Sequence, residues 1–284
     1  MNLIDLHHLG HERVIGCYLL ETPDGPALFD CGPASALPHL REGLAANGLE
    51  VGDLRHLLLS HIHLDHAGAS GVLVRENPEL RVHVSAVGAP HLVDPSRLER
   101  SARRLYGDGF DRLWGELAPV PERNVAIVGD RVLDFDCFPS PGHATHHVCY
   151  VRDGTLYAGD AAGVRIQPGG RFVLLPTPPP DIDLEDWHHT LDEIERRAPE
   201  RIALVHFGVA DDPARHVAEL RARLERWGGL VGDGATEEEW TASVLAEIRA
   251  SGEESTEEFE VAMPLTQSYA GLRRYWDKKA EAAA

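Results

Sequence analysis

Residues 60–68 read Ser-His-Ile-His-Leu-Asp-His-Ala-Gly and follow an apolar run at residues 57–59. This segment packs four potential metal ligands into six residues: His61, His63, Asp65 and His66. In an extended segment, residues two apart point to the same side, so His61 and His63 are predicted to share one ion. The chain must then turn toward a helix, so Asp65 and His66 project in a different direction. This geometry favours a second ion beside the first. With 17 histidines in the chain, a solvated histidine-rich loop is the alternative, but this register after a strand favours a metal site.

Three more potential ligands follow apolar runs elsewhere in the chain. Asp160 comes after the run 156–159, His206 comes after the run 202–205, and His143 lies behind a Pro-Gly turn that follows residues 133–138. Loops at strand ends can converge while a sheet holds them in place. We therefore expect these side chains to join the ligands of the segment 60–68 at one edge of a sheet.

The rest of the chain alternates strand-like and helix-like patterns. Short apolar runs between turn residues predict strands at 14–20, 27–29, 55–59, 82–84, 125–128, 132–138, 148–151, 155–158 and 201–205. Helical spacing predicts helices at 33–47, 95–115, 187–197 and 213–227, and an acidic helical stretch at 236–284 with a Gly-Glu-Glu-Ser break near residue 252. This order predicts an α+β chain with two sheets between helical layers.

The segment 60–68 resembles the signature of the metallo-β-lactamase superfamily. Shorter motifs continue the resemblance in the family's order over about residues 14–210: Asp30 in Phe-Asp-Cys-Gly, Pro141-Gly-His143, Gly159-Asp160, and His206 after a strand. The resemblance implies a four-layer αββα sandwich of two mixed β-sheets flanked by helices, with a metal site at one edge.

The resemblance also implies a role for each potential ligand. It assigns His61, His63 and His143 to one metal ion, and Asp65, His66 and His206 to the other. It makes Asp160 the ligand that bridges both ions. Asp30 matches an aspartate that supports the ligand loop without binding metal, a role that metal-binding histidines generally require.

Such a cluster predicts metal-dependent hydrolysis. Two divalent ions about 3.5–4 Å apart can activate a bridging hydroxide and polarise the electrophile that it attacks. Asp65 is the candidate catalytic residue, because it can orient the nucleophile as well as bind metal. The sequence has no Gly-x-Ser-x-Gly elbow and no convincing Cys–His pair to compete with this chemistry. We expect two divalent ions, with zinc first and manganese or iron as the alternatives.

The expected substrate is a small ester, thioester or lactone. Residues 141–147 are similar to the Pro-Gly-His turn of hydroxyacylglutathione hydrolases and keep their second histidine, His147, but His146 stands where those enzymes carry glycine. The sequence leaves two roles open for His146 and His147: they either support the ligands or only pack in the core. An iron-dependent dioxygenase or other redox enzyme of the same fold is an alternative function, and a phosphodiesterase is another. A non-catalytic scaffold would have lost ligands, and here the set is complete.

We expect a catalytic domain at residues 1–230 and a helical extension at 231–284. Residues 86–121 form a helical insertion and a candidate lid. Its arginines could bind an anionic substrate group, although a solvated helix face with Glu99–Arg103 pairing is simpler.

Five aromatic or imidazole side chains elsewhere in the chain are expected to have ordinary roles. Tyr106 and Trp114 are expected to pack rather than to line a pocket. His7, His8 and His11 are expected at the surface.

Composition limits the partners. The chain has 46 acidic and 27 basic residues and a formal net charge of −19, which disfavours nucleic acid because its backbone attracts a basic face. A small molecule is the expected partner, and the acidic C-terminal helices leave a homodimer open. With no signal-peptide pattern and no apolar run long enough for a bilayer, a cytoplasmic protein without a membrane partner is expected. The four cysteines are expected to be buried apolar side chains.

Overall fold

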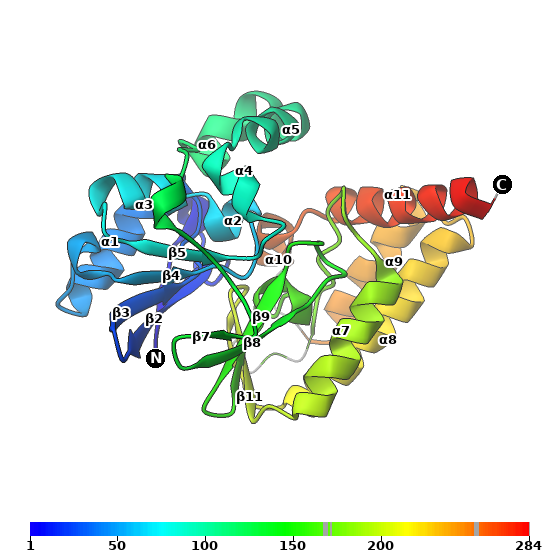
Figure 1. Ribbon diagram of the computed structural model, residues 1–284. Coiled ribbons are helices and arrows are strands. Elements are labelled where there is room, and N and C mark those ends of the chain that lie inside the picture. The colour runs from blue at the N-terminus through cyan, green and yellow to red at the C-terminus, as the bar shows by residue number, and fades with distance from the viewer. Residues whose placement is uncertain (167–169, 171, 253–255, 284) are drawn as a thin grey trace. The chain divides into compact units, whose positions relative to one another are not determined.

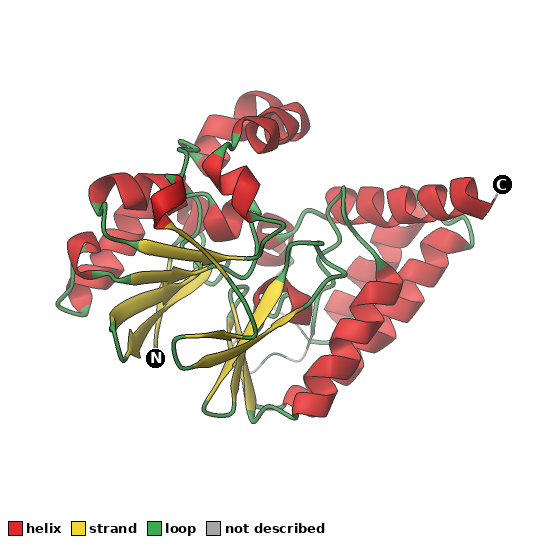
Figure 2. Ribbon diagram, viewed as in Figure 1, coloured by secondary structure: helices red, strands yellow, loops and turns green. Residues whose placement is uncertain are grey.

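A computed structural model gives the structure of this chain and describes residues 1–166, 170, 172–252 and 256–283. By their contacts the residues form two compact units: Met1–Pro139 with His146–Asp153, and Ser140–Thr145 with Gly154–Ala284. Each unit has strands and helices of its own, which Figures 1 and 2 show along the chain.

The first unit contains a six-stranded mixed sheet in the order β1-β2-β3-β4-β5-β6. Its strands are β1 Asn2–Asp5, β2 Gly16–Thr22, β3 Gly25–Phe29, β4 His56–Leu58, β5 Arg81–Val84 and β6 Val125–Ile127. The pairs β1–β2 and β2–β3 are antiparallel, whereas β3 to β6 are parallel. Since parallel strands end at the same edge, the segment after β4 leaves the sheet on the side where β3 also ends.

Six α-helices belong to the described part of the first unit. They are α1 Leu37–Ala46, α2 Leu64–Ala67, α3 Ser70–Glu76, α4 Ala89–Val93, α5 Ser96–Tyr106 and α6 Phe110–Trp114. α1 shows why they form, since it buries Leu37, Leu40 and Leu44 at helical spacing. α2 lies within the predicted ligand segment, and α4 to α6 make up the insertion.

The second sheet draws strands from both units. β7 Arg131–Val132, β8 Phe135–Pro139 and β9 Val148–Arg152 lie in the first unit, and β10 Thr155–Tyr157, β11 Arg201–Leu204 and β12 Gly208–Ala210 lie in the second. β7, β8 and β9 pair antiparallel, β10 and β11 pair parallel, and β12 is antiparallel to β11. The predicted α+β fold with two mixed sheets and flanking helices is confirmed (Figure 2).

Five α-helices follow in the described part of the second unit: α7 Leu184–Arg197, α8 Pro213–Gly232, α9 Glu237–Ala250, α10 Glu257–Ala262 and α11 Leu265–Ala283. The carboxylate of Asp183 accepts from two backbone N–H groups at the start of α7, which satisfies donors that a helix end leaves open. Trp227 of α8 and Trp240 of α9 are fully buried and meet edge to face, with ring centroids 6.0 Å apart. This aromatic contact joins α8 to the helices that follow it.

Two predicted elements are wrong in detail. The strand expected at 132–138 is the tight hairpin of β7 and β8, and its turn includes Leu133 with a φ of 51°. The helix expected at 95–115 is broken between α5 and α6, where Gly107 has a φ of 53°. In both places one residue adopts the left-handed conformation that ends a regular element. β1 and β12 were not predicted.

Other expectations on the fold have mixed outcomes. All four cysteines are buried, as predicted. Residues 253–255, where the C-terminal break was predicted, lie outside the described residues, between α9 and α10. The boundary expected at residue 230 falls within α8, and the division into two domains stays a prediction. Across the described chain, none of the helices combines the length and apolar character that crossing a membrane requires.

Candidate metal centre

The first unit holds the four ligands that the segment 60–68 predicts. The chain leaves β4, extends through residues 60–63 and turns into α2, which begins at Leu64. The metal-binding atoms of His61 and His63 lie within 4.8 Å of each other, and the two rings meet edge to face with centroids 4.5 Å apart. Further along the same loop, His66 Nε2 lies 3.7 Å from Asp65 Oδ2. The loop therefore presents two pairs of potential ligands, and their binding of metal stays a prediction.

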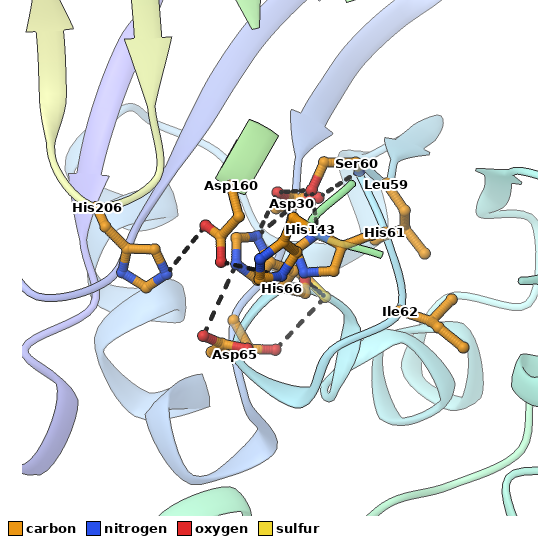
Figure 3. A network of polar contacts seen from close by, with 12 residues as sticks. Asp30, Leu59, Ser60, His61, Ile62, Asp65, His66, His143, Asp160 and His206 are labelled. Atoms are coloured by element: carbon orange, nitrogen blue, oxygen red, sulfur yellow. Dashed lines mark hydrogen bonds and ion pairs between the residues drawn. The ribbon is translucent and has the colours of Figure 1, made fainter. Parts of the chain in front are cut away.

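A buried network around Asp30 orients the histidines of this loop (Figure 3). Asp30 is fully buried, and its carboxylate accepts from the Ser60 backbone N–H at 2.7 Å and from the Ser60 hydroxyl at 2.7 Å. It also accepts from His66 Nδ1 at 2.8 Å. The Ser60 oxygen is then left to accept from His61 Nδ1, which is 2.9 Å away. With their protons on Nδ1, His61 and His66 would offer the Nε2 lone pair to a metal ion.

The backbone at Asp30 is itself unusual. Its φ is 54°, in the left-handed region that aspartate tolerates better than most residues. Two hydrogen bonds hold it there, from Asp30 N to the Leu58 carbonyl at 2.9 Å and from Cys31 N to the His66 carbonyl at 2.8 Å. A strained residue that is fixed on both sides is typical of a site where a side chain must be aimed.

Cys31 is adjacent to this network but is not a nucleophile. Burial raises the pKa of its thiol to about 12. Its Sγ contacts the His66 carbonyl oxygen at 3.3 Å. The thiol is therefore protonated at neutral pH and packs beneath the loop, because only the thiolate attacks or binds metal efficiently.

The second unit holds the other three predicted ligands around Asp160. Asp160 lies in the short 3-10 helix Gly159–Ala162 that follows β10, and it is 1% exposed. Its Oδ2 is 3.4 Å from His143 Nε2, and its Oδ1 is 3.6 Å from His206 Nε2. Figure 3 shows Asp160 facing His206. The two oxygens of one carboxylate thus face two different histidines.

Hydrogen bonds also fix His143 and His206. His143 Nδ1 donates to the Pro176 carbonyl at 2.8 Å, which leaves Nε2 as the metal-facing atom. The backbone of His206–Phe207 pairs with Arg165, whose N–H donates to the His206 carbonyl at 2.5 Å and whose carbonyl accepts from Phe207 at 3.1 Å. Both histidines are fully buried.

Trp187 of α7 supports two of these ligands, and the sequence analysis did not identify it. Its fully buried ring meets His143 edge to face with centroids 5.7 Å apart. Its indole N–H donates to the carbonyl of Ala161 at 2.8 Å, next to Asp160. Trp187 also explains Gly142, where a Cβ would lie 2.4 Å from the Trp187 Cα. A buried tryptophan in a helix has no signal in the sequence that distinguishes this role from core packing.

The donor set fits divalent metal ions. Within each unit the ligand atoms are imidazole nitrogens and carboxylate oxygens, which zinc, manganese and iron all accept. All seven ligands except His63 and Asp65 are almost fully buried. Which side chains bind which ion stays a prediction.

Two expectations about neighbouring histidines are resolved. His8 was expected at the surface, and this was wrong: it is 3% exposed and stacks on Trp114 of the insertion, with centroids 5.7 Å apart. The sequence does not show this contact because the two residues are far apart along the chain. His146, which the sequence left open, contacts the ligand loop rather than only the core, since its Nδ1 accepts from Ile62 N at 3.4 Å. Ser60 is a further supporting residue that the sequence analysis did not single out.

The insertion packs onto the ligand loop. Leu64, which stands between His63 and Asp65, forms a buried cluster with Ala102 and Phe110. Tyr106 and Trp114 pack against this cluster, as expected. The Glu99–Arg103 pair expected on the solvated face of α5 is also present, at 2.9 Å.

Comparisons with curated sequences point to one family. A family model described as the metallo-beta-lactamase superfamily matches residues 12–206. The metallo-beta-lactamase fold-containing protein ST1585 of Sulfurisphaera tokodaii is 26% identical over 184 residues, which are 61% of this chain and 68% of that relative. An N-acyl homoserine lactonase from a Bacillus species is 36% identical over 83 residues, which are 21% of this chain and 33% of the lactonase. The chain therefore spans about a third of the lactonase.

Solved structures agree on the fold. The metallo-beta-lactamase family protein TTHA1429 from Thermus thermophilus has a TM-score of 0.66 at 22% identity, covering 94% of this chain and 89% of that one. TTHA1623 in a di-iron-bound form has a TM-score of 0.54 at 25% identity, covering 74% of this chain and 93% of that one. Since the family model spans all seven predicted ligands and more than half of the residues, the chain belongs to the metallo-β-lactamase superfamily.

Proposed function

We propose that this protein is a dinuclear metal-dependent hydrolase that acts on a small lactone, ester or thioester. The proposal assigns His61, His63 and His143 to one ion, Asp65, His66 and His206 to the other, and Asp160 to both. The observation that carries it is the disposition of Asp160, whose Oδ2 and Oδ1 lie 3.4 Å and 3.6 Å from the Nε2 atoms of two different histidines. A carboxylate that served a single ion would not need a histidine ligand beside each oxygen.

Hydrolysis at such a site would give the Asp30 network and Asp65 separate roles. Two divalent ions, when bound, supply Lewis acidity toward a carbonyl oxygen and a water-derived nucleophile at neutral pH. The Asp30 network holds His61 and His66 as neutral ligands with Nε2 outward. Asp65 has a side chain that is 13% exposed, so its carboxylate can orient the attacking water and hold the proton that this water loses.

The substrate class is proposed from the relatives and from the charge of the chain. We propose a lactone first among the carbonyl substrates, and the N-acyl homoserine lactonase among the relatives supports this choice. A formal net charge of −19 disfavours phosphodiesters, since like charges repel a polyanionic substrate.

A redox function is the second candidate, because a neighbour in structure was solved in a di-iron-bound form. The ligand types do not choose between zinc and iron. The two candidates differ in what they consume, since hydrolysis needs only water and an iron oxygenase needs dioxygen.

The test begins with metal content of protein purified without added metal, followed by turnover of a panel of lactones, esters and thioesters. We expect about two zinc or manganese ions per chain and measurable hydrolysis. Asp160→Asn keeps the size of the side chain but weakens one ligand oxygen, so activity should fall at least about 100-fold. Asp192→Asn is the matched control, because Asp192 is 64% exposed and pairs with Arg221 on the surface. Iron with oxygen uptake and no hydrolysis of the panel would overturn the proposal in favour of the redox candidate.

A further inference from the structure

We propose that His146 is a positioning residue that holds the backbone between His61 and His63 and links it to the helical insertion. The inference rests on the proposed metal-dependent function, and it concerns a position where hydroxyacylglutathione hydrolases carry glycine. His146 is 6% exposed and belongs to the first unit, as does the ligand loop.

His146 contacts the ligand loop in two ways. Its Nδ1 accepts a hydrogen bond from the backbone N–H of Ile62, the residue between the two ligands, at 3.4 Å. Its ring meets His63 edge to face with centroids 5.5 Å apart, and it lies nearly parallel to His61 at 6.0 Å and 11°. A glycine would leave the Ile62 N–H without this acceptor and both imidazoles without this neighbour.

The acceptor role fixes the ring of His146. A nitrogen that accepts a hydrogen bond carries no proton, so the proton of the neutral ring lies on Nε2. The hydrogen bond thereby fixes the orientation of the His146 ring. The fixed ring in turn limits the positions that the His63 ring can take, because the two rings are in contact. Outer partners of this kind commonly change metal affinity 10–100-fold when they are removed.

A serine extends the contact to the insertion. Ser85 Oγ donates to the His146 carbonyl at 2.8 Å and accepts from Gly88 N at 3.0 Å. Gly88 is the residue before α4, where the insertion's helices start. Here a Cβ would lie 2.9 Å from Ile62 Cγ2, so the Ile62 side chain packs directly against the insertion.

Ile62 is therefore held from two directions. His146 binds its backbone, and Gly88 packs on its side chain, while Ser85 joins His146 to Gly88. A displacement of the insertion would therefore shift Ile62, and with it His61 and His63 on either side. This connects the candidate lid with the geometry of the ion held by His61 and His63.

Three substitutions separate the acceptor from the ring. His146→Asn places an amide oxygen near the position of Nδ1 and keeps the acceptor. His146→Phe keeps an aromatic ring of similar shape and removes the acceptor. His146→Gly removes both and restores the residue of the resembling hydrolases. His39→Phe is the control, since His39 lies on the surface of α1 with a side chain that is 42% exposed.

The measurement is the Zn²⁺ dissociation constant by competition with a chromogenic chelator, together with the Tm of the metal-free protein. We expect the weaker-bound zinc to dissociate about 10–100-fold more readily from His146→Phe and His146→Gly, and His146→Asn to stay close to the wild type. Ser85→Ala should weaken zinc binding in the same direction by a smaller factor. The control His39→Phe should leave the dissociation constant unchanged.

The outcomes distinguish this inference from the proposed function. If all His146 variants lower the Tm of the metal-free protein but leave zinc affinity unchanged, His146 only packs, and the inference is wrong. If Phe and Asn weaken zinc equally, the acceptor role is wrong. A wild type that binds zinc but hydrolyses nothing would count against the proposed function alone, whereas a wild type that binds no zinc would overturn both.

Discussion

At the scale of single residues, Asp30 organises the first half of the site. Its carboxylate receives three hydrogen bonds, and its φ of 54° requires a residue that accepts the left-handed conformation. Asparagine also tolerates this conformation, so Asp30→Asn changes the carboxylate without straining the backbone. The substitution therefore isolates the role of the charge and of the lost acceptor.

We expect Asp30→Asn to lower the free energy of unfolding of the metal-free protein by about 2–4 kcal/mol, because at least one buried donor loses a charged acceptor. Zinc affinity should fall about 10–100-fold, since His61 and His66 lose their orientation. Urea denaturation and chelator competition measure the two effects. Asp24→Asn, in the turn between β2 and β3, serves as control. Unchanged zinc affinity in Asp30→Asn would show that the network does not aim the ligands.

The clustering of potential ligands could be predicted from the sequence because most of the signal is local. Four of them lie within six residues, and the others follow short motifs in a fixed order. Their supporting residues could not be predicted in the same way. His146 meets Ile62 across 84 positions, and Trp187 meets Ala161 across 26, and no spacing rule links such residues before the chain is folded.

At the scale of elements, the insertion of α4, α5 and α6 is part of the support for the ligand loop. Its small core consists of Ala102 and Phe110 packed on Leu64, between two ligands. Phe110 is fully buried, and the guanidinium of Arg103 lies over its ring at 4.1 Å. A lid movement of these helices would therefore have to separate Ala102 and Phe110 from Leu64.

Phe110→Ala should remove most of this core. If the insertion unfolds together with the rest of the protein, we expect the free energy of unfolding to fall by about 3–5 kcal/mol. We also expect faster proteolysis within residues 86–121. Zinc binding should also weaken, because Leu64 loses its partner. Leu105→Ala is the matched control, since Leu105 is on α5 but 48% exposed. Normal zinc binding in a variant whose insertion is readily cleaved would separate the insertion from the loop.

Most strands and helices could be predicted, and each failure has a physical cause. Residues 132–138 were predicted as one strand, because the turn at Leu133 relies on a positive φ rather than on glycine or proline. The helix at 95–115 has the right apolar stripe, yet it ends at Gly107 and begins again at Phe110. β1 and β12 are too short for their alternation to stand out, and they exist because neighbouring strands pair with them.

At the scale of the whole molecule, two buried histidines make the stability depend on pH. Burial, and then the neighbouring His56 and Arg81, lowers the pKa of His83 to about 4. Burial also lowers the pKa of His216 to about 4. In the unfolded chain these imidazoles titrate near 6.5. As the pH falls from about 6.5 to 4, the unfolded chain therefore binds protons that the folded chain does not, and stability is lost.

We expect the free energy of unfolding of the metal-free protein to fall by up to about 1.4 kcal/mol per pH unit for each of these groups inside this window. Urea denaturation at pH 7, 6 and 5 measures the slope. His83→Gln should make the slope shallower, because one titrating group is gone. Val84→Ala, a buried neighbour in β5 that does not titrate, should lower stability at every pH and keep the slope. Equal slopes in His83→Gln and the wild type would exclude His83 as a source.

The path of the chain between the two units has a consequence for recombination between related genes. The chain changes unit after Pro139, Thr145 and Asp153, so His143 and His146 belong to different units although only Ala144 and Thr145 lie between them. A genetic crossover between two diverged relatives in this stretch would take β8 from one parent and β9 from the other, or separate Ile62 from its hydrogen-bond partner His146. Recombinants joined here should be selected against, so we expect the two units to descend together, with shared ancestry on both sides of residues 139–154.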